Sequence, residues 1–260
     1  PKWFLATLLV PQQTTADQAE EMFNQILEAC RSLDVTLIGG HSEVTYGIEH
    51  PLIIGTMLGQ VERERLITTG GAQEGDSIVV TKGVAIEGTA LLARERAQDL
   101  RDAGVAQAII DNSAALLDNP GISVITDARV ASATVQVHSL HDVTEGGLYT
   151  SLREVAVASG LGLAIEEDSV PLLPETAEVS QALGLDPMGL LASGALLITL
   201  PNKDVPSLLS ALEKAGVDAW EIGQMLSPEE GMVLFSRRGE EVDLPSFGRD
   251  ELARYFSTAM

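Results

Sequence analysis

The sequence is poor in aromatic and basic residues. Aromatic side chains make up only 4% of it, so its core must rest mainly on Leu, Val, Ile and Ala, which suits sheets covered by helices. Only 16 residues are Lys or Arg against 38 Asp or Glu, and the formal net charge is −22. Such a charge repels nucleic acid and anionic membrane surfaces, and no local basic patch offsets it. We therefore expect neither a nucleic-acid partner nor a membrane partner.

The sequence also lacks disulfide-forming cysteines and long apolar runs. Cys30 is the only cysteine, so no internal disulfide can form, and a reducing cytoplasm is the expected setting. Its position in a helical apolar pattern predicts an inert core thiol. No apolar run approaches the length of a membrane span, and no signal peptide is evident. The protein is therefore expected to be soluble and cytoplasmic. With 45% hydrophobic residues, the chain can fill one large core or two ordinary ones.

The first part of the chain has the pattern of a strand, a helix and two more strands. The opening strand covers residues 2–10. Thr15 and Gln18 form a capping box that begins a helix ending near residue 33. A strand over residues 35–38 leads into a glycine pair, and an extended apolar run covers residues 51–61. Together these elements indicate a half-domain with a mixed sheet.

A charged, Gly-rich stretch over residues 63–76 marks a domain boundary. We therefore expect one domain over residues 1–66 and another over residues 67–260. In the second domain, strands and helices interleave without a short repeat, which favours α/β or α+β architecture over a solenoid. Helices are predicted near residues 87–100, 105–117, 148–160, 175–183 and 206–215, with a short terminal one, and strands over 77–81, 135–140 and 195–200 and near 220 and 233.

The first candidate site segment follows the strand at residues 35–38. Gly39 and Gly40 remove side-chain bulk where His41 and Glu43 appear, so a ligand can approach the backbone closely in a loop. The alternative is that the glycines merely turn the chain and that Glu43 is a solvated carboxylate. This segment alone does not decide between the two interpretations.

The second candidate segment places hard oxygen donors before a helix. Asp142, Thr144 and Glu145 directly precede Gly146 and Gly147, where the helix begins. Mg²⁺ prefers carboxylates, water and phosphate oxygens, and a helix N-terminus offers N–H groups and a positive dipole end to phosphate. The alternative is an ordinary N-cap with a favourable acidic first turn.

The histidines offer a competing zinc hypothesis. His41 with Glu43, or His138 and His141 with Asp142, are possible ligand sets for a zinc hydrolase. Neither set has the two-histidine helical spacing of a zincin, so magnesium is the preferred interpretation.

Taken together, three segments resemble the landmarks of the aminoimidazole-ribonucleotide-synthase (AIR synthase) superfamily. They cover residues 38–44, 141–148 and 192–197, and their order and separation match over nearly the whole chain. The resemblance is strongest to the hydrogenase-maturation dehydratase-like branch. It implies a two-domain fold: an N-terminal mixed sheet with helices that dimerises through a shared β-barrel, and a C-terminal α/β domain.

The resemblance also implies an ATP- and Mg²⁺-dependent enzyme that activates an amide-type or related group by phosphorylation. The substrate is a small molecule or a partner-borne group, and the protein is a homodimer. The family's catalytic positions correspond to His41 and Asp142. Metal ligands correspond to Glu43, Asp142 and Glu145, and the cofactor-binding positions are Gly39, Gly40, Thr144, Glu145, Gly146 and Gly147.

Two features of the chain ends bear on this resemblance. The family's N-terminal nucleotide-binding segment would precede Pro1, and we expect it to be missing. The dehydratase branch carries a cysteine at its extreme C-terminus, where this chain ends in Met260. A non-catalytic nucleotide-binding or maturation scaffold of the same fold is therefore the alternative.

Overall fold

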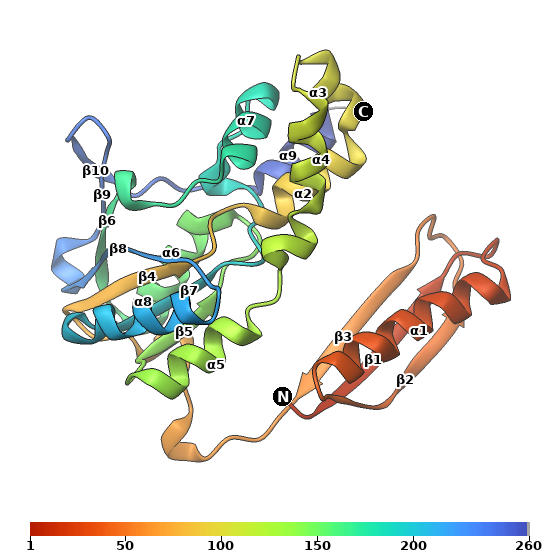
Figure 1. Ribbon diagram of the computed structural model, residues 1–260, viewed down its shortest axis with the longest axis horizontal. Helices are drawn as coiled ribbons and strands as arrows, with labels where there is room; N and C mark the ends of the chain where they lie inside the picture. Colours follow the sequence, from red (N-terminus) through yellow and green to blue (C-terminus); the bar gives the residue numbers. More distant parts are fainter. Residues whose placement is uncertain (259–260) are drawn as a thin grey trace. The chain divides into compact units, whose positions relative to one another are not determined.

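The chain folds into two compact units, Pro1–Leu66 and the part that begins at Ile67. The computed structural model describes residues 1–258, so Met260, the last residue of the sequence, lies outside the described residues. Figure 1 shows a separate sheet in each unit, with helices packed on it. This is a mixed α/β fold, as predicted.

The first unit is built on a three-stranded mixed sheet with the order β2-β1-β3. The central strand β1 (Trp3–Val10) runs parallel to β2 (Thr36–Val44) and antiparallel to β3 (Leu52–Leu58). Parallel strands need a crossover connection, and α1 (Ala16–Ser32) provides it between β1 and β2. The strand, helix and two further strands therefore follow the predicted order.

Helix α1 begins at the predicted capping box. The Thr15 hydroxyl accepts the Gln18 N–H at 3.3 Å, and the Thr15 N–H donates to the Gln18 side chain at 3.0 Å. The helix packs Ile26 and Cys30 against Ala6 on one face of the sheet. The predicted burial of the Cys30 thiol is confirmed.

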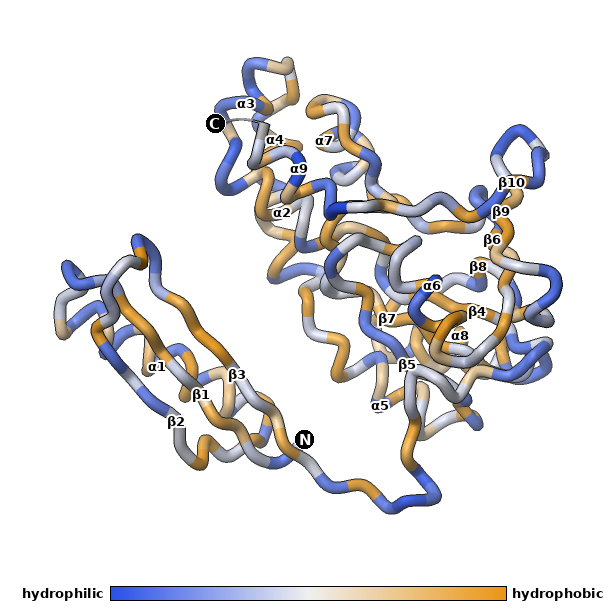
Figure 2. The backbone as a smooth tube through the Cα atoms, turned by 180° about the vertical axis from the view of Figure 1, so that it is seen from behind, coloured by the Kyte–Doolittle hydropathy of each residue, from blue (hydrophilic) through white to orange (hydrophobic). Residues whose placement is uncertain are grey.

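The other face of this sheet is open, apolar along β3 and polar at His41 and Glu43 of β2. Ile54 of β3 pairs with Thr7 of β1, which pairs in turn with His41 of β2, so the three residues share one face. Leu52 and Ile54 are 47% and 55% exposed. Figure 2 shows the hydrophobic character of β3 along its length. Within this unit, all of whose residues are described, α1 covers only the opposite face.

The predicted loop at the glycine pair is wrong, because β2 continues through it to Val44. Gly39 pairs with Leu5 and Gly40 with Ala6 on the neighbouring strand, after a register shift at Ile38. Strand β2 continues past the point where its side chains become polar, because β1 offers backbone hydrogen-bond partners to these residues. Because β2 is an edge strand with an open face, it tolerates exposed polar residues there.

The second unit is built on a seven-stranded sheet with the order β10-β9-β6-β8-β4-β7-β5. Strand β4 (Asp76–Thr81) lies in the buried interior, and its antiparallel neighbours are β7 (Leu196–Pro201) and β8 (Ala219–Leu226). The remaining strands are β5 (Ser139–Asp142), β6 (Gly162–Glu166), β9 (Met232–Phe235) and β10 (Glu241–Asp243).

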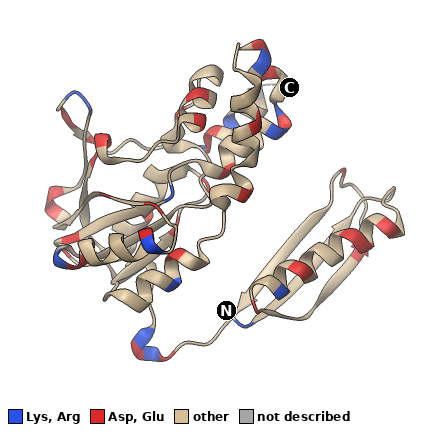
Figure 3. Cartoon of the chain, in the orientation of Figure 1, with Lys and Arg blue, Asp and Glu red and all other residues tan. Residues whose placement is uncertain are grey.

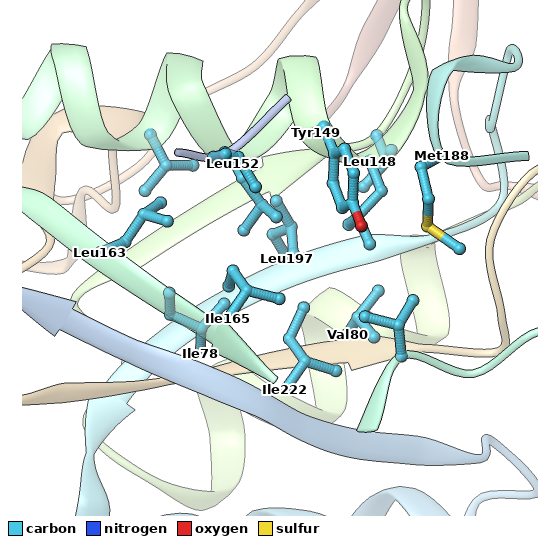
Figure 4. Packing of buried hydrophobic residues seen from close by; sticks show 14 of the residues in the cluster. Ile78, Val80, Leu148, Tyr149, Leu152, Leu163, Ile165, Met188, Leu197 and Ile222 are labelled. Atoms are coloured by element: carbon cyan, nitrogen blue, oxygen red, sulfur yellow. The ribbon is translucent and has the colours of Figure 1, made fainter. Parts of the chain in front are cut away.

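Helices cover both faces of this sheet. Helix α6 (Gly147–Ser159) packs Leu148 and Leu152 on Ile78 and Leu163, as the close view in Figure 4 shows. On the other face, α5 (Ile125–Thr134) and α8 (Val205–Lys214) enclose a second core. A third core is formed by α2 (Ile86–Glu95), α3 (Ala97–Asp102), α4 (Gln107–Ala115) and α7 (Pro174–Leu183), with α9 (Glu251–Thr258) packed against it.

Several predicted boundaries in this unit need correction. The helix predicted over residues 87–100 is two helices, because Arg96 has a non-helical backbone between α2 and α3. The strand predicted over residues 135–140 begins only at Ser139, since α5 occupies the chain up to Thr134. Helix α5 and strand β6 were not predicted.

Among residues 1–258, no helix has both the length and the apolar character needed to cross a membrane.

The strand assignment of the glycine pair predicts unequal effects of two neighbouring substitutions. A Cβ on Gly40 would lie 1.8 Å from the Ala6 carbonyl oxygen, and the Gly40 backbone has a φ of 147°. A Cβ on Gly39 meets its nearest atom at 3.4 Å. Gly40→Ala is therefore expected to lower the free energy of unfolding by about 1–3 kcal/mol, through overpacking and backbone strain. Gly39→Ala is the matched control and should stay within about 1 kcal/mol of wild type. Urea titration measures both, and equal stabilities would contradict this placement of β2.

Candidate functional site

Three of the chain's segments meet at one edge of the seven-stranded sheet. Strand β7 runs antiparallel to both β4 and β5, so it begins where those two strands end. Asp142, the last residue of β5, pairs with Leu196, the first residue of β7. The hydroxyl of Thr81, the last residue of β4, accepts the Leu196 N–H at 3.1 Å. The segments around residues 142 and 195, recognised separately in the sequence, are thus neighbours in space.

The turn after Asp142 is fastened to the segment before β7 by its backbone. The Val143 N–H donates to the Ala195 carbonyl at 3.1 Å, and the Ala192 N–H donates to the Thr144 carbonyl at 3.2 Å. The Val143 side chain is fully buried, whereas Asp142 and Glu145 on either side are exposed. The fold therefore holds the backbone firmly while it presents the two carboxylates to solvent.

Gly146 and Gly147 make the left-handed turn that opens α6. Their φ values are 78° and 68°. A Cβ on Gly147 would lie 2.4 Å from the Met188 carbonyl oxygen. The chain itself makes the close backbone approach that these glycines permit.

The first N–H groups of this turn already have acceptors. The Gly146 N–H donates to Asp250 Oδ2 at 2.6 Å, and the Gly147 N–H donates to the Thr144 carbonyl at 3.2 Å. Asp250 Oδ1 also accepts the Leu252 N–H at 2.7 Å at the start of α9. A carboxylate from the C-terminal part of the chain therefore occupies the anion-favouring end of α6. Sequence reasoning missed Asp250, whose only local signal is that of a helix cap.

The loop that leaves β4 contains a buried cation. Lys82 is 6% exposed, and its ammonium lies 3.4 Å from the carboxylate of Asp127 on α5. It also donates to the carbonyls of Ser123 at 2.7 Å and Gly121 at 3.4 Å. Burial lowers the pKa of Lys82 from its usual value, and this effect outweighs the opposing influence of Asp127. No local sequence signal predicts that this lysine is buried.

His41 and Glu43 lie in the first unit, on the open face of its sheet. The His41 Nε2 atom is 3.3 Å from Glu43 Oε2, and the two side chains are 64% and 59% exposed. Gly39 and Gly40 precede them within β2. The structure thus gathers the predicted site residues into two groups, one in each unit: residues 39–43, and residues 142–147.

Of the two ligand sets in the zinc hypothesis, His41 and Glu43 lie together but as a pair only, and the histidines of the other set have separate partners. His138 contacts Asp76 at 2.9 Å, whereas His141 contacts Glu154 at 2.9 Å and Thr69 at 3.2 Å. Among residues 1–258, no group of three or more His, Cys, Asp or Glu side chains could hold a metal ion. Magnesium makes a smaller demand, because it is usually bound by one or two carboxylates together with water and substrate phosphates. The exposed Asp142 and Glu145 fit that demand.

The distribution of charged residues over the two units agrees with the excess of acidic residues in the sequence. Figure 3 shows acidic residues on the helices of both units, with basic residues scattered among them.

Two family profiles together account for most of the chain. The N-terminal domain of AIR synthase related proteins matches residues 1–61, and the C-terminal domain of AIR synthase related proteins matches residues 73–234. The chain therefore belongs to the AIR synthase related family.

Curated relatives and solved structures agree with this membership. The selenide, water dikinase of Methanocaldococcus jannaschii is 26% identical over 92% of this chain and 70% of the relative. The carbamoyl dehydratase HypE of Cupriavidus necator is 26% identical over 87% of this chain and 62% of the relative. The chain thus spans about two thirds of these relatives' length.

The solved structures show the same fold at lower sequence identity. HypE from E. coli superimposes with a TM-score of 0.82 at 20% identity, covering 98% of this chain and 76% of that one. A structure of HypE in complex with ATP gives a TM-score of 0.76 at 20% identity, with coverages of 97% and 75%.

The contact between Asp250 and Gly146 predicts a graded response to substitution. Asp250→Ala removes the acceptors of two N–H groups and leaves the buried Gly146 donor unsatisfied, at a cost of about 1–3 kcal/mol in the free energy of unfolding. Asp250→Asn has a single acceptor oxygen, so it should lie between Ala and wild type. Asp218→Ala, at an exposed aspartate of the same unit, is the control. Thermal unfolding and the hydrogen exchange rate of the Gly146 amide measure the effect, and an unchanged exchange rate in Asp250→Ala would refute it.

Proposed function

We propose that the protein is an ATP- and Mg²⁺-dependent enzyme that activates an amide-type or related small group by phosphorylating its oxygen. The observation that carries this proposal is the meeting of the segments around residues 142 and 195 at one sheet edge, with Asp142 and Glu145 exposed beside the start of α6. Membership of the AIR synthase related family supports it, as do relatives named as a dikinase and a dehydratase and a fold shared with HypE in its ATP complex.

The proposed chemistry addresses a poor leaving group. An amide oxygen does not depart readily, so transfer of the γ-phosphoryl group from ATP to that oxygen releases ADP and turns the oxygen into part of a phosphate. An internal amine attack or the loss of a proton then expels inorganic phosphate. Catalysis of this kind consists mainly of positioning and of stabilising charge on the transferred group.

The chain's residues take separate parts in this scheme. Asp142 and Glu145 would hold Mg²⁺, which supplies charge neutralisation to the transferred phosphoryl group. Thr144, Gly146 and Gly147 would line the phosphate side of the site. In the first unit, His41 and Glu43 would supply a second group of site residues, beside the small backbone of the preceding glycines.

The substrate is proposed only as a class: a small molecule, or a group carried on a partner protein. A panel of purine intermediates, thiamine phosphate, selenide and carbamoylated peptides separates the members of that class in an ATP hydrolysis assay.

A non-catalytic, nucleotide-binding or maturation scaffold is the alternative, and one observation favours it. The Gly146 N–H, at the expected phosphate-binding turn, donates to the chain's own Asp250. ATP binding without hydrolysis in the presence of every substrate class would support the scaffold.

Asp142→Asn separates a metal ligand from a helix cap. If Asp142 holds Mg²⁺, the change retains the side chain's shape but removes the charge that the cation requires. We expect the complete enzyme to lose most of its Mg²⁺-dependent ATP turnover while its melting temperature stays near that of wild type, because Asp142 is exposed and contributes little to the core.

An N-cap role predicts a different result. Asn caps helices about as well as Asp, so stability and turnover would both remain within roughly 1 kcal/mol of wild type. Melting temperature and ATP hydrolysis should be measured on the same preparation. Full turnover in Asp142→Asn would remove the residue from the proposed machinery.

We also propose that the open face of the first unit, through its apolar strand β3, joins two copies into a homodimer. Its β3 residues are too exposed and too apolar to remain bare in an isolated chain. Ile54→Lys places a charge on that face and should shift the protein from dimer to monomer at micromolar concentration. Val157→Lys, at a 71% exposed apolar residue of α6, is the control. Sedimentation equilibrium decides the matter, and a monomeric wild type would exclude the dimer.

A further inference from the structure

The ammonium group of Lys82 faces oxygen atoms of the chain itself. An ammonium offers three N–H donors. Three oxygens surround it: the carbonyls of Ser123 and Gly121, at 2.7 and 3.4 Å, and Oδ2 of Asp127 at 3.4 Å. Lys82 therefore acts on the chain itself, although it lies between β4 and α2 at the edge where the candidate site forms.

Its surroundings resemble the ligand set of a metal cation more than those of a surface ion pair. Two backbone carbonyls and a carboxylate are the oxygen ligands that hard cations use in proteins. Asp127 is 1% exposed, and its second carboxylate oxygen, Oδ1, has no hydrogen-bond partner within residues 1–258. A carboxylate buried this deeply needs a positive charge beside it. The ammonium supplies that charge on the end of a side chain.

One of the carbonyls held by Lys82, that of Gly121, lies against Gly194, in the segment before β7. A Cβ on Gly194 would be 3.2 Å from the Gly121 oxygen and 3.3 Å from Ile122 Cα, so the two backbones are in contact. On either side of Gly194, Ala192 and Ala195 form the backbone hydrogen bonds that fasten the turn after Asp142. A continuous series of contacts thus leads from the ammonium to the turn that bears the proposed magnesium ligand.

We propose that Lys82 acts as a tethered monovalent cation: it clamps the 121–123 backbone and so positions the Asp142 turn, and its truncation leaves a site that free ammonium or potassium can fill. Lys82 is a positioning residue in this proposal. Its effect on nucleotide binding rests on the proposed function, whereas the cation clamp itself does not.

Replacement of the side chain by a free ion tests the clamp directly. Lys82→Ala is prepared in the full chain, and hydrogen exchange of the amides of residues 117–124 is followed in choline chloride, potassium chloride and ammonium chloride at equal ionic strength. We expect fast exchange in choline, and protection that returns with increasing ammonium or potassium concentration. Wild type and Lys203→Ala, at an exposed lysine of the same unit, should show no such difference between the salts.

The affinity for Mg·ATP provides the second measurement. In choline chloride, Lys82→Ala should bind Mg·ATP about 10- to 100-fold more weakly than wild type, as expected when a site is displaced by a distant change. Ammonium should restore most of this loss. A structural role through packing alone would not respond to the identity of the salt.

A double variant covers the case in which Lys82→Ala does not fold. Lys82→Met with Asp127→Leu replaces the buried pair by apolar side chains, an exchange that proteins often accept without loss of stability. We expect this variant to fold, to bind Mg·ATP weakly and to ignore ammonium. Wild-type affinity in the double variant would overturn the proposal.

The remaining outcomes are also distinct. Identical exchange of Lys82→Ala in the three salts would overturn the cation clamp, whatever the nucleotide result. If the complete wild-type protein binds no Mg·ATP, the proposed function fails, and the salt dependence of exchange still decides the clamp.

Discussion

The antiparallel pairing of β7 with both β4 and β5 determines where this unit can carry chemistry. Because β7 runs opposite to its two neighbours, its first residue lies beside the last residues of both. Helices α2 and α6 follow from these strand ends, so their first turns lie near the same edge. The backbone bonds from Val143 and Ala192 then join the turn after β5 to the segment before β7. Each candidate residue of the second unit owes its position to this arrangement.

Elements whose causes are local could be predicted from the sequence. The capping box at Thr15 needs only its partner three residues later, and Gly160 ends α6 in the left-handed conformation that glycine favours. Strand β2 is different, because its passage through Gly40 depends on the backbone of β1. Helix α5 was missed for another reason: only Asp127 and Ala131 of its residues are fully buried, so it carries no continuous apolar stripe.

The same division applies to the candidate site. Asp142, Thr144 and Glu145 could be singled out because the passage from strand to glycine-led helix is contained in one short segment. Asp250 and Lys82 could not, because their roles depend on partners far away in the sequence. A lysine near a strand end is ordinarily solvated. Only the three-dimensional structure shows that Lys82 is enclosed.

The two interactions missed by sequence reasoning have a common electrostatic effect. Asp250 places a negative charge at the N-terminus of α6, and Lys82 places a positive charge among backbone carbonyls. Asp250 accepts a backbone N–H, and Lys82 donates to backbone carbonyls, that would otherwise face a ligand or solvent. The backbone at this edge is therefore ordered before any ligand binds. Asp142 and Glu145 carry negative charge that faces solvent there. A phosphate approaching two carboxylates is repelled unless a cation lies between them. In the proposed function, phosphate binding at this edge would therefore depend on a divalent cation, because the N-terminus of α6 is already occupied by the carboxylate of Asp250.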